Sequence, residues 1–448
     1  MTRTQAYRPD PRILELGDAF FDPVEPARFP AGISRFLNER AADEVGLGEV
    51  DWLAHFHRFE PLPDNLPQPL ALRYHGHQFR HYNPDLGDGR GFLFAQLRDD
   101  RDRLLDLATK GSGQTPYSRT ADGRLTLKGA VREVLATEML EALGVRTSRS
   151  FAVFETGEPL VRGDEPSPTR SAVLTRLSHG HIRIGSFQRL AFFEETENLE
   201  RLVRYCLEHL FADEPEAGAV RLLDRISQAT AELAASYMAA GFVHGVLNTD
   251  NINVTGESFD YGPWRFAATW DPQFTAAYFD HAGLYAFGRQ PEAIQWNLAQ
   301  LAGCLALIAD PPALSELLQG WGERFHLALV AALLKRIGVQ PGDPDEDRAL
   351  ARLIVAELAT QETGIDRFFF EWRAGRPPAG SDEELRRLLE PRLSAATHPY
   401  WSEGAPCSLL IEEVEAIWSP IARDDDWSAF DAKIAAIRSM GEAMGAAA

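Results

Sequence analysis

Cysteine and long apolar runs are both scarce in this sequence. It has three cysteines, Cys206, Cys304 and Cys407, and none of them forms a CxxC pair. This pattern excludes a disulfide scaffold and a zinc finger, and it is typical of a reducing compartment. The longest apolar runs, such as residues 327–334, are far shorter than the roughly 20 residues that a membrane helix needs. The first residues also lack the apolar stretch of a secretory signal. We therefore expect a cytoplasmic protein with no membrane partner.

Positive charge is the second shortage. The 448 residues include 45 Lys and Arg against 66 Asp and Glu, which gives a net charge of −21 and a pI near 5.0. A chain this acidic repels a nucleic-acid backbone, so we expect no nucleic-acid partner. It would repel a nucleotide too, unless the pocket supplies its own cations. The P-loop pattern GxxxxGK[ST] is also absent.

The remaining composition is that of an ordinary globular protein, large enough for two to three domains. Strand-like patterns dominate the region from about 65 to 188, with a helical stripe at 127–143. Helical patterns then follow at 199–210, 220–240, 291–308, 313–336, 347–361 and 382–396. In the first 64 residues we expect one helix, within 26–47. This order predicts two lobes with a cleft between them.

A glycine-rich turn precedes the apolar run 92–97. Gly87, Gly89 and Gly91 alternate there, with Arg90 between two of them. Glycines let backbone N–H groups approach phosphates closely, and an arginine adds charge-assisted hydrogen bonds. A tight β-turn, which Asp-Gly favours by itself, explains the same letters.

Lys110 ends the strand-like run 104–108 and enters the sequence KGSG. Glu133 follows on the predicted helix, as in the lysine–glutamate pair of kinase-type sites. A further turn at Asp122-Gly123 could line the same pocket. Solvated surface charges explain Lys110 and Glu133 equally well if each is considered alone.

Two arginines, Arg176 and Arg183, lie seven residues apart in LTRLSHGHIRIGSF. Together they could clamp a polyphosphate. Ordinary surface arginines fit the spacing as well.

The segment from His244 to Gly262 carries the strongest chemical signal. Asp250, Asn251 and Asp260 are hard oxygen ligands of the kind that Mg²⁺ accepts beside phosphates. Apolar pairs at 242–243 and 252–254 predict short strands on either side of Asp250. In protein kinases the catalytic base stands two residues after the histidine, and here Val246 occupies that position. The metal ligands are present while the usual base is missing.

Five histidines, His55, His57, His75, His77 and His81, could hold a metal ion. No third carboxylate ligand is fixed near them, so structural roles are favoured.

Taken together, GHQFR…PDLGDGRG, KGSGQTPYSRTADGR, VREVLATEML, VLTRLSHGHIRIGSF and HGVLNTDNINVTGESFDYGPW resemble the selenoprotein O family. The resemblance covers residues 70–300. It implies an α+β, two-lobed protein-kinase-like fold. Residues 65–188 would form the β-rich nucleotide-binding N-lobe and 189–400 the helical C-lobe. Residues 1–64 would pack on the lobes, and 401–448 would form a divergent C-terminal segment.

The resemblance also implies a function, the transfer of AMP from ATP to Ser, Thr or Tyr hydroxyls of proteins, with self-modification possible. ATP would bind in a flipped orientation, and Mg²⁺ or Mn²⁺ would be the cofactor. The implied nucleotide-binding residues are Gly87, Gly89, Arg90, Lys110, Asp122, Gly123, Arg176, Arg183 and Asp260. Glu133 would orient Lys110, Asn251 and Asp260 would bind the metal, and Asp250 would accept the proton. Ala276 stands where the family often has a redox cysteine.

Three alternatives remain open at this point. The first is UMP transfer with Mn²⁺. The second is true phosphotransfer with Asp250 as the base. The third is a non-catalytic scaffold that only binds ATP.

Overall fold

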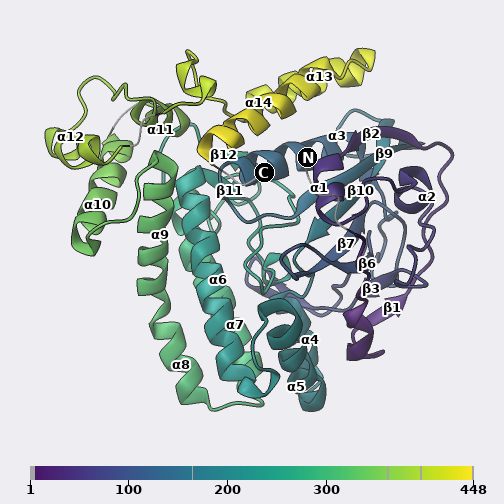
Figure 1. The fold of residues 1–448 in the computed structure, drawn as a ribbon. Helices are drawn as coiled ribbons and strands as arrows, with labels where there is room; N and C mark the ends of the chain where they lie inside the picture. The colour runs from purple at the N-terminus through teal and green to yellow at the C-terminus, as the bar shows by residue number, and fades with distance from the viewer. Residues whose placement is uncertain (1–5, 164, 361–362, 394–395, 446–448) are drawn as a thin grey trace.

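The computed structural model describes residues 6–163, 165–360, 363–393 and 396–445 and has a mixed α/β fold (Figure 1). Its strands are β1 (Phe21–Pro23), β2 (Ile33–Leu37), β3 (Leu70–Leu72), β4 (Gly76–Gln78), β5 (His81–Asn83), β6 (Leu93–Arg98), β7 (Leu104–Lys110), β8 (Leu125–Thr126), β9 (Arg149–Leu160), β10 (Thr169–Ser178), β11 (Phe242–His244) and β12 (Trp264–Phe266). Its helices are α1 (Glu39–Glu44), α2 (Trp52–Phe56), α3 (Leu127–Ala142), α4 (Ile184–Phe192), α5 (Thr196–Tyr205), α6 (Gly218–Ala240), α7 (Gln290–Leu305), α8 (Pro311–Gln319), α9 (Trp321–Ile337), α10 (Pro344–Thr360), α11 (Ile365–Arg373), α12 (Glu383–Leu389), α13 (Ile411–Asp424) and α14 (Ser428–Met444).

Within these described residues, an antiparallel sheet with the order β1-β3-β6-β7-β10-β9-β2 forms the first half of the fold, and β8 pairs with β10. The sheet separates two apolar cores. On one side Val131 of α3 packs with Val153 and Leu174. On the other side, Phe56 of α2 packs with Phe94, so the N-terminal segment covers that face. Strands such as β7 are therefore buried along their whole length, as expected for strands covered on both faces.

Helix α3 follows the predicted helical stripe closely. Thr126 caps its N-terminus, where Oγ1 accepts a hydrogen bond from Gly129 N at 3.1 Å. This side-chain cap satisfies one of the N–H groups that a helix start leaves unpaired. Gly144 follows the helix with φ +79°, a conformation that glycine adopts without strain.

The second half of the fold is helical, as predicted. The long helix α6 packs between α7 and α9 and passes directly into β11, so it supports the loop that carries Asp250 (Figure 1). Gly241, with φ +68°, ends it.

Several local expectations were wrong. The region expected to be mainly β up to 188 is already helical from Ile184 in α4. The helix expected within 26–47 is present as the short α1, and β2 occupies the residues before it. The helix expected at 313–336 breaks at Gly320 into α8 and α9. Residues 252–254 form only an isolated bridge, Arg183 with Asn253, not a strand. The predicted helix ends at 361 and at 394–396 fall on or beside residues 361–362 and 394–395, which lie outside the described residues.

The C-terminal helices α13 and α14 lie across α3 (Figure 1). Arg438 of α14 donates two hydrogen bonds, of 2.8 and 2.9 Å, to the buried carboxylate of Glu138 on α3. Lys128, at the start of α3, pairs with Glu415 of α13 at 2.7 Å. The last helices of the chain therefore fix the position of α3.

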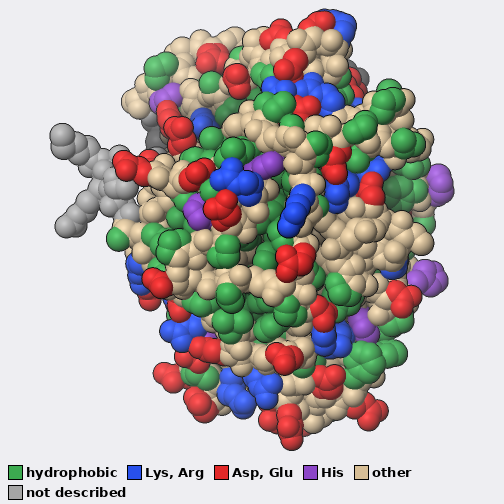
Figure 2. All heavy atoms as spheres, turned by 90° about the vertical axis from the view of Figure 1, so that its right-hand side faces the viewer, with side chains coloured by type: hydrophobic (Ala, Val, Ile, Leu, Met, Phe, Trp, Pro, Cys, Tyr) green, Lys and Arg blue, Asp and Glu red, His purple; other side chains and the backbone are tan. Residues whose placement is uncertain are grey.

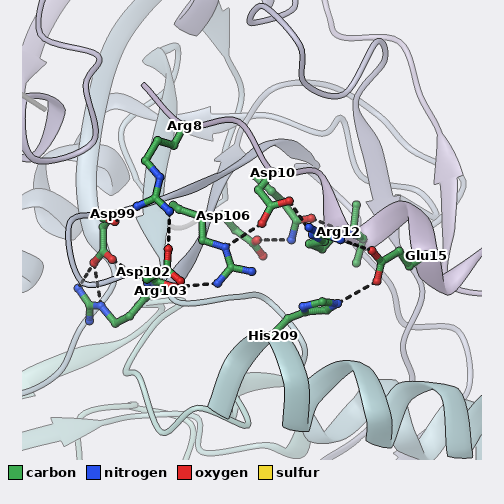
Figure 3. A network of polar contacts seen from close by, with 12 residues as sticks. Arg8, Asp10, Arg12, Glu15, Asp99, Asp102, Arg103, Asp106 and His209 are labelled. Carbon is green, nitrogen blue, oxygen red and sulfur yellow. Dashed lines mark hydrogen bonds and ion pairs between the residues drawn. The ribbon is translucent and has the colours of Figure 1, made fainter. Parts of the chain in front are cut away.

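A polar network fixes the N-terminal residues to the sheet and to the helical half (Figure 3). Asp10 accepts hydrogen bonds from Arg12 at 2.6 Å and from Arg98 of β6 at 2.7 Å. Glu15 lies 2.8 Å from His209, which follows α5. The N-terminal segment thus contacts both halves of the fold.

Figure 2 shows one face of the molecule, on which acidic and basic side chains alternate with small apolar areas. Among the helices of the described residues, none combines the length and the apolar composition needed to cross a bilayer.

Candidate functional site

A buried charge cluster lies where β7 ends beside α3. Lys110 Nζ lies 2.6 Å from Glu133 Oε2 and 2.9 Å from Asp260 Oδ1. Arg176 of β10 approaches the same carboxylates, with Nη1 at 3.4 Å from Glu133 and 3.7 Å from Asp260. Two cations therefore face two anions, and the Asp260 end of this cluster borders an open cavity.

The charges of this cluster strongly affect the pKa of Asp260. Burial opposes ionisation, but Lys110 and nearby arginines hold the pKa of Asp260 well below its usual range. Its backbone has φ +58°, which is uncommon for a residue other than glycine. Such conformations cluster at functional sites. Asp260 is thus a fixed, ionised carboxylate at the cavity wall.

The glycine-rich turn forms another wall of this cavity, whose volume is about 290 Å³. A Cβ at Gly91 would collide with the backbone of Thr109, and one at Gly87 would collide with the ring of Tyr117. Gly87, Gly89 and Arg90 all line the cavity. Only glycine therefore permits this close packing of the turn against its neighbours.

Arg183 lies deeper, at the N-terminus of α4. Its guanidinium lies 4.1 Å from the ring centre of Tyr74 and 4.9 Å from that of Phe259. Nη1 donates to the backbone oxygen of Asp250 at 2.9 Å, and Nη2 lies 3.3 Å from Asp88. Arg183 thus joins the glycine-rich turn to the loop of Asp250 while it still lines the cavity.

Asp250 is buried beside these groups, with only 7% of its surface exposed. Its Oδ1 atom has no hydrogen-bond partner among the described residues. Burial raises the pKa of Asp250 to about 6. A Cβ on Gly76 of β4 would lie 3.0 Å from this same Oδ1. A side chain at position 76 would therefore press against this buried oxygen, and glycine avoids that contact.

Asn251 is held by a hydrogen bond to Val246, the residue at the position where kinases have the catalytic base. Asn251 Nδ2 donates to the backbone oxygen of Val246 at 2.9 Å, which orients the amide. The amide oxygen of Asn251 and the carboxylate of Asp260 are hard donors that suit Mg²⁺ or Mn²⁺ together with phosphate and water oxygens. No group of three or more His, Cys, Asp or Glu in the described chain is arranged to hold a metal ion by itself.

Asp122 and Gly123 lie apart from the other predicted residues. Asp122 forms an ion pair with Arg162 at 2.8 Å near the surface. Neither Asp122 nor Gly123 lines the cavity, although Ala121 does. Gly123 has φ +70°, and its carbonyl accepts a hydrogen bond from Gly113 N. The pair shapes the loop that covers the glycine-rich turn.

Some site residues were not predicted from the sequence. Tyr74, Asp88 and Tyr117 line the cavity, and Thr249 Oγ1 connects Gln188 of α4 at 2.5 Å with the backbone N–H of His77 at 2.7 Å. No sequence signal marks these contacts, because they join segments far apart in the chain. His77 also packs edge-on against Trp296, consistent with a structural role.

Glu257 lies in the turn before Asp260 and has a shifted pKa, so the pH dependence of stability can be tested there. Its Oε2 accepts a hydrogen bond from His179 N at 2.7 Å. Burial raises the pKa of Glu257 from 4.5 to about 7. A raised pKa in the fold means that ionisation is disfavoured there. The free energy of unfolding therefore falls as the pH rises from about 4.5 to about 7.

We expect Glu257→Gln to raise the free energy of unfolding by about 1–3 kcal/mol at pH 8, because glutamine keeps an acceptor and removes the charge. The gain should shrink as the pH falls toward 5. Urea unfolding across this pH range measures it, with the exposed Glu208→Gln as control. An equal gain at all pH values would contradict this assignment.

The fold and the site define a class of protein. It is a mixed α/β protein with a cavity at one end of strand β7, lined by a glycine-rich turn, by cationic side chains and by the carboxylate of Asp260. The chain belongs to the protein adenylyltransferase SelO family, whose model matches residues 4–403.

Related proteins are similar to this chain along most of its length. Protein nucleotidyltransferase YdiU of Synechocystis sp. is 39% identical over 473 residues, covering 96% of this chain and 98% of the relative. Protein nucleotidyltransferase YdiU of Synechococcus elongatus is 40% identical over 481 residues, covering 97% and 95%. The protein of the same name from Chromobacterium violaceum is 38% identical over 388 residues, covering 84% and 80%.

Proposed function

We propose that this protein transfers AMP from ATP to Ser, Thr or Tyr hydroxyls of proteins and releases pyrophosphate. The observation that carries the proposal is the buried, unpartnered Oδ1 of Asp250 beside the cationic cavity. Family membership and the names of the relatives support it. The architecture in this proposal is kinase-like, with residues 65–188 as the nucleotide lobe and 189–400 as the helical lobe. Residues 1–64 and 401–448 pack against them.

In the proposed reaction the acceptor oxygen attacks the α-phosphorus of ATP. The bond from that phosphorus to the bridging oxygen breaks, and pyrophosphate leaves with the electron pair. The hydroxyl proton passes to Asp250, which acts as the general base in this proposal. Negative charge grows on the phosphate oxygens, so Lys110, Arg176 and Arg183 contribute electrostatic stabilisation.

The other predicted residues have supporting roles in this proposal. Gly87, Gly89 and Arg90 hold phosphate oxygens or the ribose, and Glu133 orients Lys110. Asp122 and Gly123 shape the covering loop. Asn251 and Asp260 would hold Mg²⁺ or Mn²⁺, which acts as a Lewis acid on the phosphate oxygens when it is bound.

ATP labelled at the α- or the γ-phosphorus tests this function. We expect α-label, and no γ-label, to enter a mixture of acceptor proteins or the enzyme itself, because AMP carries only the α-phosphorus. EDTA should abolish the labelling. Label from the γ-position alone would instead establish phosphotransfer with Asp250 as base. ATP binding without any labelling would establish a scaffold. Competition with UTP separates AMP from UMP transfer.

A further inference from the structure

A second cavity adjoins the nucleotide cavity. It has a volume of about 380 Å³ and shares Leu86, Tyr117 and Arg119 with the first. Arg73, Arg189 and Phe193 line its outer part. We call this second cavity the outer groove. Because the two cavities share walls, a molecule in the outer groove would lie next to whatever fills the inner one.

One wall of the outer groove lies close to Asp250, although Asp250 itself does not line the groove. The position that a Cβ of Gly76 would occupy lies 3.0 Å from Asp250 Oδ1 and 3.1 Å from Leu86 Cδ1. Leu86, a wall of the groove, is therefore a close neighbour of the unpartnered carboxylate oxygen. An acceptor hydroxyl must approach that oxygen and the α-phosphorus at once. The outer groove adjoins the nucleotide cavity and has Leu86 beside Asp250, so it lies on the side from which a hydroxyl would approach.

The outer groove carries positive charge, although the protein as a whole is acidic. Arg119 is exposed and makes no hydrogen bond or ion pair through its side chain within the described part of the chain. Arg189 donates one hydrogen bond, to the backbone oxygen of Ala19 at 3.2 Å, and its guanidinium packs on the ring of Phe193. Arg73 is paired with Asp22 at 2.9 Å. On a chain with a net charge of −21, two arginines with free donors form a local positive site.

Apolar surface lies beside these charges. Phe193 is 51% exposed and Phe192 is 54% exposed, and Phe192 stacks on Tyr82. Exposed aromatic rings next to arginines are typical of protein-binding surfaces. One acidic residue, Asp85, also lines the groove and is exposed.

From these contacts we propose that the outer groove binds the acceptor, and that the acceptor is a protein segment with Asp or Glu next to its modified hydroxyl. This proposal rests on the proposed function. The arginines select the acidic segment by charge, while the rest of the acidic surface repels it elsewhere. The aromatic rim contributes apolar contact. Substrate choice then lies in a groove separate from the nucleotide cavity.

Binding and transfer are measured with two peptide series. One series carries a serine flanked by acidic, neutral or basic residues. The other carries alanine in place of that serine and a fluorophore, so its binding needs no chemistry. We expect the acidic peptides to bind most tightly and to have the lowest KM, with binding that weakens at high salt.

Two variants at exposed positions change the groove charge in opposite directions. Phe193→Glu should raise the KM of the acidic peptide by about tenfold, and Asp85→Asn should lower it, because each alters the field around Arg189 and Arg119. Neither should change the KM of ATP by more than about twofold. Leu327→Glu is the matched control, because Leu327 is 48% exposed on the distant helix α9 and should leave both constants unchanged.

Equal binding of acidic and neutral peptides would overturn the proposal. So would a change in the KM of ATP instead of the KM of the peptide, since the groove would then hold part of the nucleotide. If the acidic alanine peptide binds but no α-label is ever transferred, the proposed function fails while the groove stands. If α-label is transferred without any charge preference, only the groove proposal fails.

Discussion

Asp250→Asn is expected to lower the rate of AMP transfer by about 100-fold to 10,000-fold, the usual contribution of a general base. Asparagine preserves the shape of the side chain but cannot accept the hydroxyl proton. Within the described part of the chain the Oδ1 atom of Asp250 has no hydrogen-bond partner to lose, and asparagine has the same size, so the buried loop should keep its geometry. ATP should still bind, because Lys110, Arg176 and Arg183 remain.

Transfer of α-label and ATP binding by calorimetry are measured on the same preparations. Asp271→Asn, at an exposed position in the following segment, is the control and should retain transfer. A variant at Asp250 that transfers AMP at the parent rate would remove this residue from the mechanism. Loss of ATP binding together with transfer would indicate a role in holding the nucleotide instead.

The second large effect is expected at Arg438, which does not line the cavity. Arg438→Ala leaves the carboxylate of Glu138 buried at 3% exposure without its two hydrogen bonds. Removing one partner of a buried ion pair costs about 3–5 kcal/mol, and because Arg438 is 33% exposed we expect about 2–3 kcal/mol here. Glu138 lies on α3, the helix that also carries Glu133. Displacement of α3 should therefore loosen the pair with Lys110 and reduce the transfer rate.

The double variant Arg438→Ala with Glu138→Ala separates charge from packing. It removes the uncompensated carboxylate, so part of the unfolding free energy and of the activity should return. Arg423→Ala on α13 is the control, because its side chain is 70% exposed and, among the described residues, forms an ion pair only with the adjacent Asp424. Urea unfolding and α-label transfer provide the two measurements. A double variant less stable than Arg438→Ala alone would contradict the argument.

Local pattern in the sequence was sufficient for much of the fold. The apolar run before Lys110 predicted β7, and the helical period around Glu133 predicted α3. Both patterns depend on neighbours within one or two turns of the chain. Asp250 and Asn251 are adjacent in sequence, so their joint placement in one loop needed no tertiary information. The roles of these residues remain predictions.

Other elements depended on contacts that no local pattern encodes. The short helix α4 lies in a region whose letters resemble strands, and its first residue hydrogen-bonds to Ile252. The break at Gly320 and the helices α13 and α14 were also missed. Their position depends on packing against α6 and α3. Tertiary packing overrides weak local preference at such places.

The sequence by itself determined which residues can do chemistry here: one strand-end lysine, a helical glutamate, two arginines, and the Asp250, Asn251 and Asp260 set without a base at Val246. Only the tertiary structure decided that a buried oxygen of Asp250 lies beside Gly76 with no partner among the described residues. It also decided that Tyr117 covers Gly87 and that the outer groove adjoins the cavity. The reason is physical. Residue type and period act over a few positions, whereas burial, unpaired atoms and shared cavity walls arise between segments that are far apart in the chain.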